Sequence, residues 1–169
     1  MLNLSREMTP DTGGAGRWRG QPGTRNVKQV LEPVTAVAWM VSMRHPLRGL
    51  CGGDDAAPYE NRFRVGTPEE QAIENSVAAQ LPAGSVLAYQ YGGGAGFGDP
   101  LARDPEAVRE DVLDEYVSPE AALERYGVVL DGSVDEGEVT LDLDATRALR
   151  EPLARERTDA QTRKRPNGA

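Results

Sequence analysis

The chain has 169 residues, a formal net charge of −8 and a mean hydropathy of −0.54. This length suits one domain or one compact subunit, and the acidic balance argues against nucleic acid as a partner because neutralising phosphates requires clustered Lys and Arg. Aromatic residues make up only 5%, whereas Gly numbers 19 and Pro 12. The core is therefore expected to be modest and the loops frequent.

The sequence predicts no association with a membrane. Its longest apolar run, residues 34–41, is interrupted by Thr35 and is typical of a buried strand rather than a membrane span. Residues 1–7 lack the apolar core of a secretory signal, and the single cysteine, Cys51, excludes an internal disulfide framework. A cytoplasmic protein is the simplest expectation.

The first half is expected to be rich in β-structure punctuated by glycine. Strands are predicted at residues 27–31 and 34–43, where β-branched and apolar residues are concentrated. The sequence Thr67-Pro68-Glu69-Glu70 matches a capping box, which predicts a short helix up to about Ala79. Residues 85–91 then return to a strand pattern.

The second half mixes helices and short strands. Helices are predicted to begin after Asp104 and Ser118, each followed by proline at the first helical position, and Gly127 is placed to end the second helix. Two short strands are expected next, joined across Asp131-Gly132. A last helix capped by Asp144 should be cut or kinked at Pro152. The whole pattern indicates an α+β fold.

Thirteen of the glycines fall into three clusters, at residues 13–23, 49–53 and 92–98. Glycine is used where the backbone adopts positive φ or approaches another group closely, so a ligand, a partner chain or a tight turn could require them. The dinucleotide fingerprint fails, because the sixth position is Phe97 counted from Gly92 and Asp99 counted from Gly94. Nucleotide binding by this loop is therefore disfavoured.

The inventory of catalytic side chains is small. His45 is the only histidine and Cys51 lies six residues further on, beside Asp54 and Asp55. A zinc or nucleophile site built from these residues is one alternative, but a structural zinc site normally has four ligands. The preferred interpretation is a partly exposed His45 and a buried, inert Cys51. No catalytic residue is assigned.

Several motifs resemble the hydantoinase B/oxoprolinase family. Residues 10–20, Pro-Asp-Thr-Gly-Gly-Ala-Gly-Arg-Trp-Arg-Gly, resemble that family's P-D-S-G-G-A-G-R-x-R-G-G segment, and residues 92–100 resemble its G-G-G-G-Y-G-D-P run. Similar segments follow in order: Arg103-Asp104-Pro105, Asp111-Val112, residues 117–122 and residues 126–130. The similarity extends over about residues 10–150. It predicts one domain at 10–153, an N-terminal extension at 1–9 and a polar, disordered tail at 154–169.

The resemblance implies a role in a complex. Family members are several times longer, and this chain looks like their C-terminal part. They work with a hydantoinase A-like ATP-binding subunit, and they open cyclic amides or, in relatives, carboxylate ketones. The resemblance thus implies ATP and a divalent metal for the complex and none bound by this chain alone. The residues expected to face a partner or substrate are Gly13, Gly14, Gly16, Arg17, Gly92, Gly93, Gly94, Gly96, Gly98 and Asp99.

Two departures from the family pattern are visible: Ala95 replaces a glycine and Phe97 replaces the tyrosine. The hypothesis is a small subunit of an ATP-dependent cyclic-amide hydrolase or ketone carboxylase, which completes the fold and active-site wall of a larger hydantoinase B-like partner. The alternative is a stand-alone binding or scaffold domain, or a non-functional fragment. Substrate and reaction type stay open.

Overall fold

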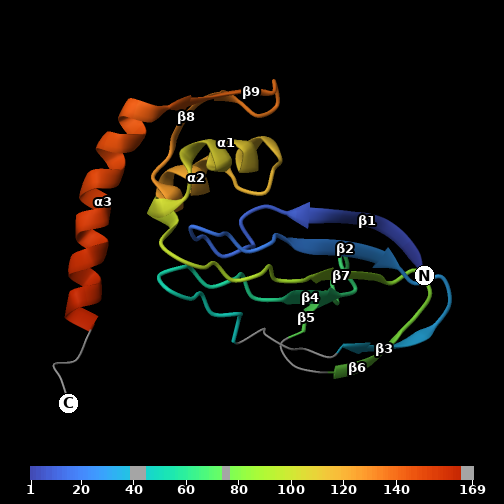
Figure 1. The fold of residues 1–169 in the computed structure, drawn as a ribbon. Helices are drawn as coiled ribbons and strands as arrows, with labels where there is room; N and C mark the ends of the chain where they lie inside the picture. Colours follow the sequence, from blue (N-terminus) through green and yellow to red (C-terminus); the bar gives the residue numbers. More distant parts are fainter. Residues whose placement is uncertain (39–44, 74–76, 165–169) are drawn as a thin grey trace, which may run out of the picture.

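The computed structural model describes residues 1–38, 45–73 and 77–164, and it combines antiparallel sheets with helices (Figure 1). The strands are β1 (Leu2–Thr9), β2 (Gly23–Gln29), β3 (Val34–Ala38), β4 (Glu60–Phe63), β5 (Gln71–Ala72), β6 (Val77–Leu81), β7 (Val86–Gln90), β8 (Val129–Ser133) and β9 (Glu138–Asp142). The helices are the short 3-10 helix η1 (Pro100–Ala102), α1 (Pro105–Leu113), α2 (Pro119–Tyr126) and α3 (Leu143–Lys164). The predicted α+β class is confirmed.

The main sheet has five antiparallel strands in the order β1-β2-β7-β4-β5. Residues 1–9, expected to be an extension, instead supply its edge strand β1, which pairs with β2 from Leu2 opposite Gln29 to Thr9 opposite Gly23. Strand β7 confirms the strand expected at 85–91 and pairs with both β2 and β4. Strand β7, near the end of the first hundred residues, therefore lies between β2 and β4 in the same sheet.

A two-stranded sheet, β3 with β6, packs against the main sheet on the side away from α1 and α2 (Figure 1). The core between the two layers is formed by buried Val30, Phe63, Ile73, Leu81 and Leu87. The expectation of a buried strand at 34–41 is wrong in its described part, because residues of β3 alternate between half-buried and exposed. Residues 39–43 of the predicted strand lie outside the described residues.

The helix predicted from Thr67 to Ala79 is wrong. The Thr67 hydroxyl donates back to the Arg64 carbonyl (2.8 Å), while Glu70 accepts from the Gly66 N–H (3.0 Å) and from Arg62 (2.9 Å). The capping residues thus close a turn, and no helical segment follows among the described residues of this region. Pairing of β5 with β4 and of β6 with β3 prevails over the local helix signal.

Helices α1 and α2 begin and end as expected. Asp104 accepts from the Glu106 N–H (3.1 Å) and Ser118 from the Ala121 N–H (3.0 Å), so each satisfies a free donor of the first turn. Gly127 ends α2 in the left-handed conformation, with φ of 60°. The second core lies beneath these helices and consists of Ala15, Val108, Val112, Val117, Ala121, Ala122, Tyr126, Val128 and Val139.

The C-terminal elements depart from expectation in three places. The β8–β9 turn lies after residue 133, and Gly132 is inside β8, opposite Val139. Asp142, rather than Asp144, accepts from the Ala145 N–H (2.9 Å) at the start of α3. The helix runs through Pro152 to Lys164, so residues 154–164 are helical where a disordered tail was expected. None of the described helices combines the length and apolar character that crossing a bilayer requires.

The buried Tyr126 gives a measurable pH dependence. Burial raises its pKa from 10.0 to about 12, because the ionised phenolate would lose its hydration. The unfolded chain releases this proton near pH 10 while the folded chain retains it. The free energy of unfolding should therefore fall by up to ~1.4 kcal/mol per pH unit between pH 10 and 12. Urea unfolding across this range should show the slope in the native chain and a shallower one in Tyr126→Phe.

Candidate functional site

The three glycine clusters meet at one end of the main sheet. We call this assembly the glycine platform and define it as residues 12–20, 49–54 and 92–98. The Gly14 N–H donates to the Gly94 carbonyl (2.9 Å), which joins the first segment to the third. Further backbone hydrogen bonds connect Asp54 to Ala15, Gly96 to Asp54, Leu50 to Gly96 and Gly98 to Leu50. Three distant parts of the sequence therefore form one hydrogen-bonded unit.

The glycines are required by close approach of backbone to backbone within this chain. A β-carbon on Gly20 would collide with the Gly94 carbonyl, and one on Gly96 would collide with the Ala15 carbonyl. Neither glycine has positive φ, so proximity rather than backbone conformation excludes a side chain.

The residues expected to face a partner or substrate occupy different positions on the platform. Gly14, Gly16, Gly93 and Gly96 are buried, whereas Gly13, Gly92, Gly94 and Gly98 are half-buried. Arg17 is exposed and lies over the Trp18 ring, 6.0 Å from its centre. Asp99 caps η1 through the Leu101 N–H (3.0 Å) and pairs with Arg157 of α3 (2.8 Å).

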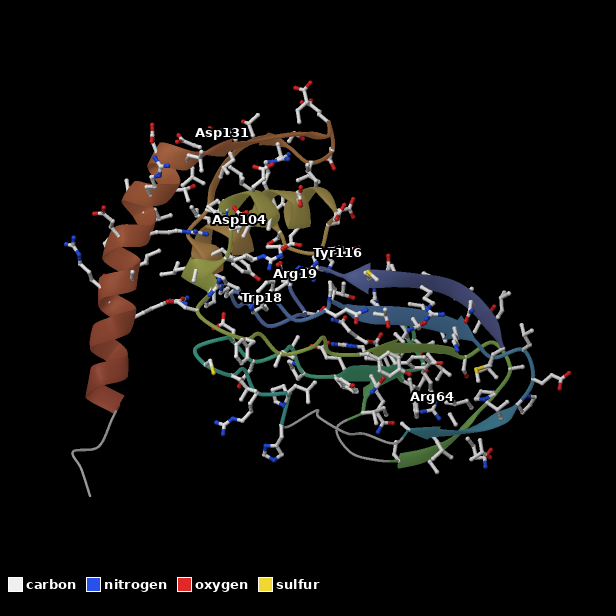
Figure 2. The ribbon with its side chains drawn as sticks, viewed as in Figure 1. Trp18, Arg19, Arg64, Asp104, Tyr116 and Asp131 are labelled. Atoms are coloured by element: carbon white, nitrogen blue, oxygen red, sulfur yellow. The ribbon has the colours of Figure 1, made fainter. Side chains whose placement is uncertain are left out.

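A buried ion-pair network attaches the platform to α1. Asp111, on the inner face of α1, accepts from Arg19 Nε (2.8 Å) through one oxygen and from Arg103 Nη2 (2.7 Å) through the other. The Asp111 side chain is only 8% exposed, so both oxygens are withdrawn from water and need these donors. Arg19 also lies over the Tyr116 ring, 4.7 Å from its centre, and Figure 2 shows the two residues side by side between sheet and helices.

A second clamp joins the start of the platform to α2. Asp11 accepts from the Ser118 N–H (2.9 Å), and its own N–H donates to the Tyr116 carbonyl (3.1 Å). Asp11 adopts φ of 60°, a conformation that Asp tolerates better than most residues. The Pro10-Asp11 and Ser118-Pro119 motifs are therefore in direct contact, and the Asp11 carboxylate satisfies a backbone N–H at the start of α2.

Two substitutions of Asp11 should separate the contribution of its hydrogen bond to stability from that of its left-handed backbone conformation. Asp11→Ala removes the acceptor and puts Ala, which tolerates positive φ less well than Asp, at this position, for an expected loss of ~2–3 kcal/mol in the free energy of unfolding. Asp11→Gly removes the acceptor but relieves the backbone, so its loss should be about 1 kcal/mol smaller. Urea unfolding of both variants gives the comparison. Equal losses would show that the backbone conformation contributes nothing.

The outer face of the platform carries large apolar side chains. Phe97 forms an antiparallel bridge with Trp18 and a parallel bridge with Leu50. Directly opposed residues in such bridges project their side chains to the same face, so the three are neighbours. Their exposed fractions are 64% for Trp18, 62% for Leu50 and 49% for Phe97. We call these three residues the apolar patch, and Figure 2 shows Trp18 at the end of the sheet.

The proposed His45 and Cys51 site is not assembled. Cys51 is exposed, contrary to the expectation of a buried thiol, because it occupies a tight turn with φ of 53°. His45 is also exposed. Within residues 1–38, 45–73 and 77–164, no group of three His, Cys, Asp or Glu side chains is arranged to hold a metal ion.

Asp54 is the carboxylate with a perturbed pKa on the platform. Partial burial raises its pKa above the ordinary value, and the nearby Arg157 and Arg125 partly offset the rise. Asp55 and Asp99 act in the same direction as burial.

Sequence reasoning missed the ion-pair network and the apolar patch. The ion-pair network could have been anticipated from one feature of the sequence. Asp111 lies on the same helical face as Val108 and Val112, where a charged residue requires a buried partner. The patch had no comparable signal, because Trp18, Leu50 and Phe97 become neighbours only through bridges between distant segments.

The structure thus defines an α+β module built on interlocked glycine segments and clamped to a small helical unit. The chain belongs to the hydantoinase B/oxoprolinase family, whose model matches residues 1–100. That match begins at residue 1 and so includes the whole of β1, which was expected to lie outside the family-like domain.

Three relatives illustrate the range of the family. The chain is 35% identical over 129 residues to the caprolactamase subunit beta of Pseudomonas jessenii, covering 73% of this chain and 22% of that protein. It is 43% identical over 193 residues to the acetone carboxylase alpha subunit of Xanthobacter autotrophicus, covering 93% and 25%. A nucleotide-free structure of acetone carboxylase, described for ATP-dependent acetone carboxylation, matches with a TM-score of 0.71 at 25% identity, covering 97% and 26%. The chain therefore spans about a quarter of the length of these relatives.

Proposed function

We propose that this chain is a small, non-catalytic subunit of a cytoplasmic, ATP-dependent complex that hydrolyses cyclic amides or carboxylates ketones. The observation that carries the proposal is the match to about a quarter of much longer enzyme subunits. A caprolactamase and an acetone carboxylase among the relatives support the two reaction classes. One domain over residues 10–153, extended by β1, would be the unit that enters the complex.

The partners in this proposal are a hydantoinase A-like ATP-binding subunit and a larger hydantoinase B-like subunit. The chain would complete the wall of the larger subunit, with the glycine platform facing it. The close backbone packing of the glycine segments and the negative charge of Asp99 favour ATP binding by another subunit rather than by this loop. The described residues also lack a donor set for the divalent metal. In this proposal ATP and the divalent metal are bound by the other subunits of the complex.

Native affinity purification from the source cell, followed by intact-complex mass spectrometry, tests the proposal. We expect recovery of a hydantoinase A-like chain and a larger hydantoinase B-like chain together with this one. Turnover of a lactam, a hydantoin or a ketone by the recovered complex should require ATP. Recovery of an 18.2 kDa monomer alone would instead favour the stand-alone binding domain or remnant.

A further inference from the structure

We infer that the apolar patch of Trp18, Leu50 and Phe97 is the anchor by which this chain docks onto the larger hydantoinase B-like subunit. The inference rests on the proposed function and adds the residues that would make the contact. It also gives the glycines a different role. Their close backbone packing fixes the segments that carry the patch, and the glycines themselves do not contact the partner.

The patch has the composition of an interface centre. Trp and Arg are enriched among the residues that dominate binding energy, and Arg17 lies over the exposed Trp18 ring. The three apolar side chains are adjacent rather than scattered, which distinguishes a patch from ordinary surface exposure. Trp18 and Phe97 exchange two backbone hydrogen bonds, of 3.0 and 2.9 Å. Their backbone is therefore fixed before binding, which lowers the entropy cost of association.

The length of the relatives favours one occupant. Because this chain matches only 22–26% of the proteins it resembles, the remaining three-quarters of each relative is available to cover the equivalent surface. A second copy of this chain fits less well. A twofold contact would place each patch opposite itself, so Arg17 would approach its own symmetry mate while two chains of charge −8 came together.

The test measures binding of this chain to the larger hydantoinase B-like subunit that co-purifies in the experiment above. Trp18→Ser, Leu50→Ser and Phe97→Ser should each weaken binding, with a loss of about ten-fold or more for Trp18→Ser. The matched control is Leu123→Ser, which removes a side chain of 46% exposure from α2 and should change affinity less than about two-fold. Thermal melts of each variant verify that the fold is retained.

The unique, exposed Cys51 provides a second readout beside Leu50. An environment-sensitive fluorophore on this thiol should shift its emission on binding of the larger subunit, and Trp18→Ser should reduce that shift. If the patch variants bound the larger subunit as tightly as the native chain does, the patch would not be the anchor, and the proposed function would be unaffected. Dimerisation of the chain that depends on Trp18 would also overturn the inference. Absence of any larger subunit in the purification would overturn the proposed function and the patch together.

Discussion

Asp111→Ala is expected to lower the free energy of unfolding by about 3–5 kcal/mol, or to prevent folding altogether. The substitution leaves Arg19 and Arg103 without their shared carboxylate in an environment where their side chains are only 20% and 13% exposed. An unpaired buried charge costs far more than the ion pair itself contributes. The loss should be measured by urea unfolding monitored by far-UV circular dichroism.

The control for this prediction is Glu110→Ala, which removes the same charge from the adjacent, exposed position of α1. Its effect should stay within about 0.5 kcal/mol. Combining Asp111→Ala with Arg19→Met and Arg103→Met should recover part of the loss, because no buried charge then remains unpaired. If Asp111→Ala and Glu110→Ala destabilise the protein equally, the network does not clamp α1 to the platform.

The second large effect is expected at the closest backbone contacts of the platform. Gly20→Ala and Gly96→Ala should each destabilise the protein by roughly 3 kcal/mol or more, since the new methyl group meets a carbonyl oxygen that cannot move without breaking the platform. The half-buried Gly94 supplies the matched control in the same loop. A β-carbon at Gly94 would lie 3.2 Å from the nearest atom, the Gln21 nitrogen, so Gly94→Ala should cost much less.

Thermal unfolding and one-dimensional NMR of the three alanine variants distinguish these cases. We expect Gly94→Ala to retain native dispersion and a melting temperature near that of the native chain. Gly20→Ala and Gly96→Ala should melt far lower or lack a cooperative transition. If all three variants were equally stable, the distance from the added β-carbon to its nearest atom would not predict the loss of stability. Close packing would then not be the reason for these glycines.

Short-range signals in the sequence predicted the helical part of the fold. The caps at Asp104 and Ser118 and the left-handed Gly127 depend only on residues within one turn, so they could be identified without knowledge of the rest of the chain. The capping box at Thr67 failed for the complementary reason. Its side chains closed a turn locally, while strands far away in sequence determined the structure of the residues that follow.

The candidate site was predictable only in part. The glycine clusters and the motifs around Asp11, Arg19 and Asp111 were identified, and the resemblance to the family was correct. That the glycines require one another, and that Asp111 joins two of the motifs, depends on contacts between residues about 75 to 90 positions apart. Such pairings leave no periodic trace in a single sequence. Whether the platform faces a partner stays a prediction.

The clamps have a consequence for the way the protein is made. Arg19 and Asp111 are 92 residues apart, and Asp11 and Ser118 are 107 apart, so the first contact must wait until α1 has left the ribosome and the second until Ser118 has. At about 5–20 residues per second, the glycine segment at residues 12–20 waits on the order of ten seconds for its partners. During this interval the edge of β2 that later pairs with β7 is open to other nascent chains. Closure of these long-range contacts is therefore expected to be a late step in folding, after the local helices have formed.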